Sequence, residues 1–180
     1  MRIIVTGAQG TGKTTILNEL KGLYPTITNV CRTLGQKGVK LNEMGDTESQ
    51  AMIFDTYNEL LEQKHFISDR GLSDVFGYSE WLEKNGKITK DELTRENDKY
   101  VDYVNNYPAV YFYFPIEFPV ENDGVRSVDE EFRKEIDENI HGNLLTHNMG
   151  RKDLQGGNGR VYGNRVKSLG RLIPPPTHDR

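Results

Sequence analysis

A glycine-rich octapeptide near the N-terminus constrains this chain more than any other feature of its sequence. Residues 7–14 read Gly-Ala-Gln-Gly-Thr-Gly-Lys-Thr and match the pattern G-x-x-x-x-G-K-S/T at every fixed position. Residues 2–6 before it are typical of a short buried strand, and residues 15–20 after it are typical of the first turns of a helix. A strand, such a loop and a helix in this order predict a phosphate-binding loop, and the alternative is an ordinary glycine-rich turn.

The residue types in this loop suit the binding of a nucleoside triphosphate with Mg²⁺. Glycines let the backbone turn tightly and bring consecutive N–H groups close to phosphate oxygens. The N-terminus of the following helix adds a partial positive charge. We expect Lys13 to reach the β- and γ-phosphates and the Thr14 hydroxyl to bind Mg²⁺. The predicted nucleotide-binding residues are Gly7, Gln9, Gly10, Thr11, Gly12, Lys13, Thr14 and Thr15.

Length, charge and cysteine content narrow the class of protein further. A chain of 180 residues suits one domain with a full core. The net charge of −4 gives no broad attraction to DNA or to an anionic membrane, and no apolar run is long enough to cross a bilayer. Cys31 is the only cysteine, and the phosphate-loop strand at the N-terminus leaves no room for a signal peptide. We therefore expect a cytoplasmic protein.

Strand-like and helical segments alternate along the chain. The segments that suit strands are 2–6, 26–30, 66–69, 109–114 and 161–162. Helical patterns fall between them, with N-caps predicted at Asp46, Thr89 and Ser127, a charged helix through about His141, and a last helix at 165–169. This alternation predicts an α/β fold with a mostly parallel sheet and helices on both faces. Ligands should bind at the carboxyl edge of its strands.

Asp69 is the main candidate for a catalytic carboxylate, because it closes an apolar strand as a Walker B acid does. It is expected to hold Mg²⁺, directly or through water, or to accept a proton from an acceptor hydroxyl. The alternative is a helix N-cap. Asp74, four residues later, is predicted either to contact the acceptor or to be a solvated acid in the first turn of a helix.

Three further residues are candidates for substrate binding. Arg32 and Arg70 follow predicted strands, and their guanidinium groups suit an anionic acceptor. The Gln50 amide suits the edge of a base. The alternative for each is an ordinary surface or capping role.

Two arginines flank the start of the charged helix. Arg126 and Arg133 would lie over the phosphates if residues 121–126 act as a hinge and the helix closes as a lid that excludes water. The alternative is a solvated helix with Glu/Arg pairs.

Three segments carry a resemblance to a known family: GAQGTGKTT at 7–15, ISDRGLSDVFGY at 67–78 and VENDGVRSVDEEFRKEID at 120–137. With them the chain resembles the P-loop kinases of the nucleoside and nucleotide kinase superfamily. Within it, the chain is most similar to the AAA-type ATP-binding group that includes the ribosylnicotinamide kinase domain of NadR-like proteins, common in bacteria and phages.

The resemblance implies a three-layer P-loop NTPase fold with a five-stranded parallel sheet and a helical lid at about 120–148. It implies ATP and Mg²⁺ as cofactors, a single kinase domain over 1–170, and a monomer or homodimer in a bacterial or phage-infected cytoplasm. Residues 171–180 would form a flexible proline-rich tail. The implied catalytic residues are Lys13, Asp69, Arg126 and Arg133, with Thr14 and Asp69 at the metal and acceptor contacts near Arg32 and Arg70.

One departure from the family bears on the acceptor. Related kinases often carry a Glu at the end of the second strand as the base for an acceptor hydroxyl, whereas residues 28–32 of this chain contain no acid. Either Asp69 is the base, or the acceptor is a phosphate that needs none. The expected function is therefore a kinase of a nucleoside or nucleoside monophosphate. The alternatives are a kinase of hydroxymethylated pyrimidine in phage DNA and an ATP-driven switch.

Overall fold

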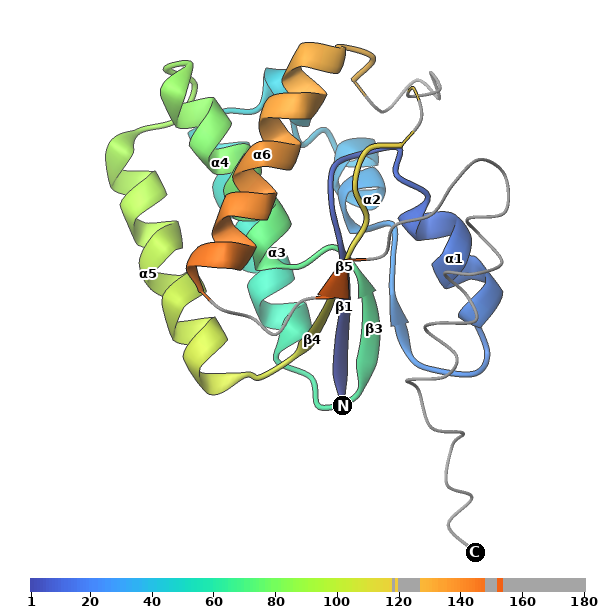
Figure 1. Ribbon diagram of the computed structural model, residues 1–180. Helices are drawn as coiled ribbons and strands as arrows, with labels where there is room; N and C mark the ends of the chain where they lie inside the picture. Colours follow the sequence, from blue (N-terminus) through green and yellow to red (C-terminus); the bar gives the residue numbers. More distant parts are fainter. Residues whose placement is uncertain (118, 120–126, 148–151, 154–180) are drawn as a thin grey trace, which may run out of the picture.

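Five parallel strands form one sheet in the order β2-β3-β1-β4-β5 in the computed structural model (Figure 1). The structure describes residues 1–117, 119, 127–147 and 152–153. The strands are β1 (Arg2–Thr6), β2 (Thr26–Ile27), β3 (Phe66–Asp69), β4 (Val110–Tyr113) and β5 (Lys152–Asp153). The central strand β1 is paired with β3 on one side and with β4 on the other. The predicted parallel sheet is confirmed, although its fifth strand, β5, was not among the predicted segments.

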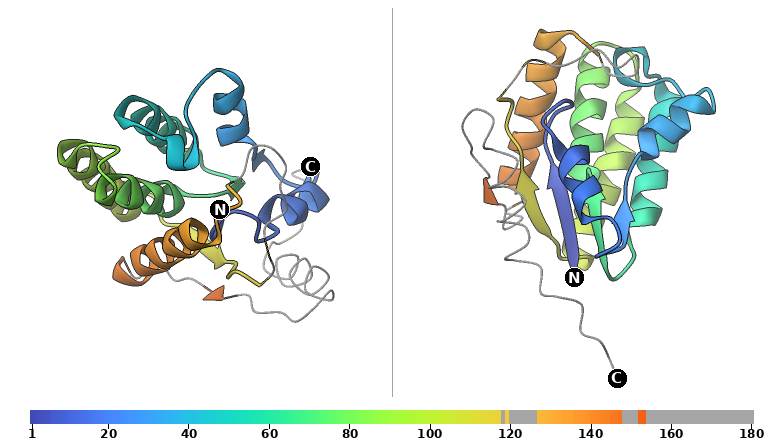
Figure 2. Two further views of the ribbon diagram at one scale, coloured as in Figure 1. Left: turned by 90° about the horizontal axis from the view of Figure 1, so that it is seen from above. Right: turned by 90° about the vertical axis from the view of Figure 1, so that its right-hand side faces the viewer.

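The helices form two unequal layers over this sheet. They are α1 (Lys13–Leu20), α2 (Val30–Gln36), α3 (Thr47–Leu61), α4 (Leu72–Lys84), α5 (Lys90–Asn106) and α6 (Glu130–Thr146), with a short 3₁₀ turn, η1 (Asn42–Met44). Figure 2 shows α1 on one side of the sheet and the group α3, α4, α5 and α6 on the other. The prediction of helices on both faces is therefore confirmed.

Side-chain alternation along β1 produces the two layers. Ile3 and Val5 point to the α1 side, where they pack with Ile16 and Leu17. Ile4 points to the other side and joins the larger core formed with α3 to α6. Because side chains alternate along a strand, a run that is apolar throughout can be buried on both faces at once.

Two N-cap predictions are confirmed and one is wrong. Asp46 accepts a hydrogen bond from the Ser49 amide at 2.9 Å, and Thr89 accepts one from the Glu92 amide at 3.2 Å. The third cap is Asp129, which accepts from the first amides of α6, whereas the Ser127 hydroxyl bonds to Glu43. The helix also extends beyond His141, to Thr146.

The second strand is shorter than predicted. β2 pairs with β3 only through Thr26 and Ile27, and Val30 begins α2. Asn29 explains the difference, because it adopts a left-handed backbone conformation with φ +61° that ends the strand. The predicted hinge at 121–126, the last strand at 161–162, the last helix at 165–169 and the tail at 171–180 lie outside the described residues. No helix in the described part is long and apolar enough to span a membrane.

Candidate active site

The loop between β1 and α1 lies at the carboxyl edge of the sheet, the upper edge in Figure 1. Gly7 has φ +132°, and a Cβ atom there would lie 2.3 Å from the Phe114 carbonyl oxygen, so only glycine fits between β1 and β4. Gly12 has φ +87° and serves as the N-cap of α1. No side-chain hydrogen bond caps this helix, so its N-terminus is suited to an anion.

Lys13 is held inside this loop by backbone oxygens. Its ammonium group donates to the Gly7 carbonyl at 2.7 Å and to the Ala8 carbonyl at 2.5 Å, and the side chain is almost fully buried. Burial and the nearby Arg70 cation lower its pKa to about 8, against the opposing effect of Asp69. The loop therefore contains a cation whose charge is only partly compensated.

Asp69 and Thr14 meet at the same edge. The Thr14 hydroxyl donates to Asp69 Oδ2 at 2.5 Å, across 55 residues of sequence. Asp69 does not cap α4, because the N-cap of that helix is Gly71. A hydroxyl and a carboxylate oxygen side by side are the donor types that Mg²⁺ prefers, so these two residues fit the predicted metal role.

Asp74 stabilises the backbone of the loop through hydrogen bonds. Its carboxylate accepts hydrogen bonds from the Gly7 amide at 3.0 Å, the Gly71 amide at 2.9 Å and the Thr6 hydroxyl at 2.7 Å, with Ser73 as a fourth donor. The side chain is fully buried, and burial raises its pKa. Asp74 is therefore not a solvated acid, and it ties the end of β1 to α4. We call residues 7–14, Asp69, Arg70 and Asp74 the loop edge.

Arg70 is strained in its backbone and lies beside the loop. Its φ of +89° is unusual for a residue with a side chain. The guanidinium group lies 5.2 Å from the centre of the Tyr78 ring. It is close enough to Lys13, Cys31 and Tyr57 to shift their pKa values.

The other two predicted acceptor residues are placed differently. Arg32 lies on α2, where it is exposed. Gln50 is buried on α3, and its amide nitrogen donates to the Val75 carbonyl at 3.1 Å and to the Ser79 hydroxyl at 2.8 Å on α4. These contacts hold α3 to α4, away from the loop edge.

Helix α6 brings two charged side chains to the loop. Arg133 is fully buried and donates to the Gln9 carbonyl at 2.9 Å and to the Gly10 carbonyl at 3.4 Å. Asp137 accepts from the Ala8 amide at 3.3 Å and from the Tyr113 hydroxyl at 2.6 Å. Sequence reasoning missed Asp137, although its spacing of four residues from Arg133 places both on one helical face. Arg126 lies outside the described residues.

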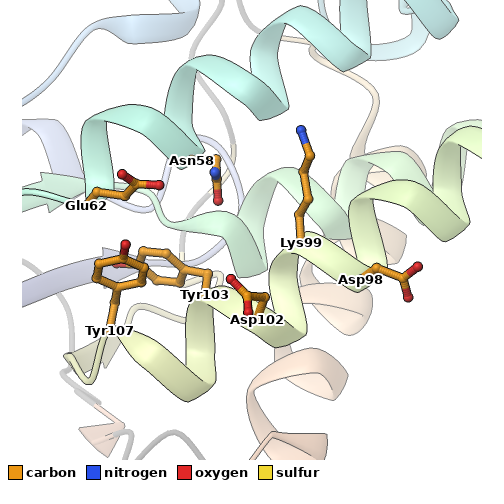
Figure 3. A pocket seen from close by; sticks show the side chains of 7 residues that line it. All are labelled: Asn58, Glu62, Asp98, Lys99, Asp102, Tyr103 and Tyr107. Carbon is orange, nitrogen blue, oxygen red and sulfur yellow. The ribbon is translucent and has the colours of Figure 1, made fainter.

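A surface cavity of about 300 Å³ lies away from this edge (Figure 3). It is lined from α3 and α5 by Asn58, Glu62, Asp98, Lys99, Asp102, Tyr103 and Tyr107. Arg2, at the opposite end of β1 from the loop, stacks 5.0 Å above the Tyr107 ring. None of the predicted site residues lines this cavity. Over the described residues no cluster of three or more His, Cys, Asp or Glu side chains forms a metal site.

Comparisons with known proteins identify the family and the fold of this chain. A family described as an AAA domain matches residues 2–159, and the chain belongs to that family. No curated protein matches the sequence. Among solved structures, the deoxyadenosine kinase of M. mycoides with dCMP and dCDP aligns with a TM-score of 0.66 and 16% identity, over 96% of this chain and 100% of that one.

Two further structures share the fold. NadR in complex with NR aligns with a TM-score of 0.73 and 14% identity, over 99% of this chain but only 54% of NadR. YorR of Bacillus subtilis in complex with phosphorylated GDP aligns with a TM-score of 0.58 and 18% identity, over 96% and 95% of the two chains. The chain thus has the fold of the P-loop nucleoside and nucleotide kinases.

Proposed function

We propose that this chain is a kinase that transfers the γ-phosphoryl group of ATP, in the presence of Mg²⁺, to a nucleoside or nucleotide. The observation that carries the proposal is the meeting of Lys13, the Thr14–Asp69 pair and Arg70 at one edge of the sheet. Phosphoryl transfer needs little covalent chemistry from the protein beyond positioning and positive charge around the moving group. This edge supplies both.

Each residue has a distinct role in this proposal. Backbone amides of the loop and the Lys13 ammonium group bind the β- and γ-phosphates. Thr14 and Asp69 hold Mg²⁺, which supplies charge neutralisation when bound. Arg133 and Arg126 stabilise the charge that develops on the transferred group, and Arg70 binds the acceptor.

The test is acceptor-dependent release of ADP. With ATP and Mg²⁺ alone we expect little ADP, and release should rise when a panel of nucleosides, nucleoside monophosphates and hydroxymethylated DNA includes the true acceptor. Lys13→Ala should lower the rate by roughly 100-fold or more while the melting temperature shows a folded protein. Lys21→Ala, an exposed lysine just after α1, is the matched control and should leave the rate unchanged. Full activity of Lys13→Ala, or rapid ADP release that no acceptor increases, would reject the kinase proposal.

A further inference from the structure

We infer that the acceptor is a nucleoside monophosphate, whose phosphate oxygen is the nucleophile. The inference rests on the proposed kinase function and narrows its substrate class. A sugar hydroxyl needs a general base to remove its proton, whereas a phosphate monoester is already an anion at neutral pH. The carboxylates at the loop edge therefore bear on which acceptor the site suits.

Both carboxylates that flank Arg70 are engaged in other contacts. Asp69 Oδ2 accepts from the Thr14 hydroxyl at 2.5 Å, which turns it toward the metal side of the loop. Asp74 accepts from four donors and is fully buried. Asp74 is therefore closed to an acceptor hydroxyl, and Asp69 serves the metal side of the loop in this proposal.

Arg70 is positioned to bind an anion at the loop edge. Within residues 1–117 and 127–147, no carboxylate forms an ion pair with its guanidinium group, which instead stacks over the Tyr78 ring. Its backbone φ of +89° is strained, and such strain persists where the surrounding structure fixes a side chain in a required position. The fold thus holds a half-buried cation beside the phosphate loop.

The electrostatics favour a charged acceptor over a neutral one. Arg70 and Lys13 are like charges close enough that Arg70 helps lower the pKa of Lys13. A phosphate dianion beside Arg70 would relieve this repulsion through charge-assisted, bidentate hydrogen bonds. A neutral nucleoside would leave it in place.

The chemical step then balances without a base. An oxygen of the acceptor phosphate forms a bond to the γ-phosphorus of ATP. The bond from that phosphorus to the β–γ bridging oxygen breaks, and its electron pair leaves with ADP. The products are ADP and a nucleoside diphosphate, and no proton has to move.

The experiment compares each nucleoside with its own 5′-monophosphate under ATP and Mg²⁺, with products separated by chromatography. We expect at least one monophosphate to give its diphosphate with a kcat/KM at least tenfold above that of any nucleoside. A nucleoside that is converted to its monophosphate faster than any monophosphate reacts would overturn the inference and leave the kinase proposal standing. Silence toward every acceptor would reject the kinase proposal itself.

Variants of Arg70 test its role separately. Arg70→Ala should raise KM for the monophosphate by about 10- to 100-fold, with KM for ATP nearly unchanged. Arg2→Ala is the matched control, because Arg2 also stacks on a tyrosine but at the far end of β1. Arg70→Gly should lose acceptor binding equally yet melt above Arg70→Ala, since glycine adopts φ near +89° without strain. An unchanged acceptor KM in Arg70→Ala would overturn the assignment.

Discussion

Lys13 at the loop edge and Glu96 in the seam between α4 and α5 are both buried, and burial shifts the pKa of each toward its uncharged form. The pKa of Lys13 falls to about 8, whereas that of Glu96 rises to about 9. We define the seam by Gln50, Ser79, Glu92 and Glu96. The two regions share one physical cause and differ in how they compensate for it.

The loop edge keeps its charges by placing opposite ones nearby. Asp69, Asp74 and Asp137 all raise the pKa of Lys13 and so limit the effect of burial. Backbone amides and hydroxyls stabilise the Asp74 carboxylate in the same region. These interactions maintain a dense set of ions at the mouth of the loop, which is costly unless a charged ligand uses them.

In the seam, by contrast, the buried acid Glu96 is neutral. The Glu96 side chain is fully buried, one of its oxygens bonds to the Ser79 hydroxyl, and Glu92 lies close enough to raise its pKa further. With a pKa of about 9, Glu96 holds a proton at neutral pH. Its hydrogen bond helps fix Ser79, which accepts from the Gln50 amide. The comparison suggests that ionised buried groups mark the ligand site and that the neutralised acid serves packing.

Asp74→Ala gives the strongest test of the loop edge and should destabilise the fold by about 3–5 kcal/mol. The change leaves the buried amides of Gly7 and Gly71 without their acceptor. Asp91→Ala is the matched control, since Asp91 is also an acid in the first turn of its helix but is exposed. It should cost about 0.3–1 kcal/mol. Urea unfolding measures both, and equal losses would show that Asp74 is an ordinary helix-terminus acid.

Glu96→Gln tests the seam through the pH dependence of stability. The pKa of Glu96 in the folded protein, about 9, lies above its ordinary value of 4.5, so the unfolded state loses this proton first. The free energy of unfolding therefore falls as pH rises between these values. Glutamine cannot ionise, so the variant should be more stable than the wild type by about 1–3 kcal/mol at pH 8.5, with a smaller difference toward pH 5. Chemical unfolding across this pH range measures the effect.

Asp98→Asn provides the control for that experiment, because it exchanges an acid for an amide on the exposed side of the same helix. It should leave the pH profile close to that of the wild type. If Glu96→Gln were no more stable than the wild type at high pH, the acid would be ionised in the fold and the contrast between the two regions would disappear.

Local sequence signals were sufficient for the frame of the molecule. The strand, loop and helix around residues 7–14, the strand that ends at Asp69 and the caps Asp46 and Thr89 all depend on neighbours within a few positions. The end of β2 was missed because the left-handed conformation of Asn29 has no strong signature beside a β-branched run.

Long-range contacts decided what the sequence did not reveal. Asp74 reaches the Gly7 amide across 67 positions, and Asp137 reaches the Ala8 amide across 129. Both read as ordinary helix acids until the packing of α4 and α6 against the loop is known. The pairing of Asp69 with Thr14 depends on strand order in the same way.

Arg133 also links α6 to the loop edge, and its replacement should have the smallest of these effects. The buried guanidinium group donates to the Gln9 and Gly10 carbonyls, so Arg133→Ala should loosen the loop and remove positive charge near the transferred group. We expect turnover to fall roughly tenfold, equivalent to about 1.4 kcal/mol of transition-state stabilisation. Arg133→Lys keeps the charge but not the paired donors, so its turnover should lie between those of the wild type and Arg133→Ala. The exposed neighbour Lys134→Ala is the control. If Arg133→Ala lowers only the melting temperature while the folded enzyme turns over normally, Arg133 holds the loop without taking part in transfer, and α6 belongs with the packing elements.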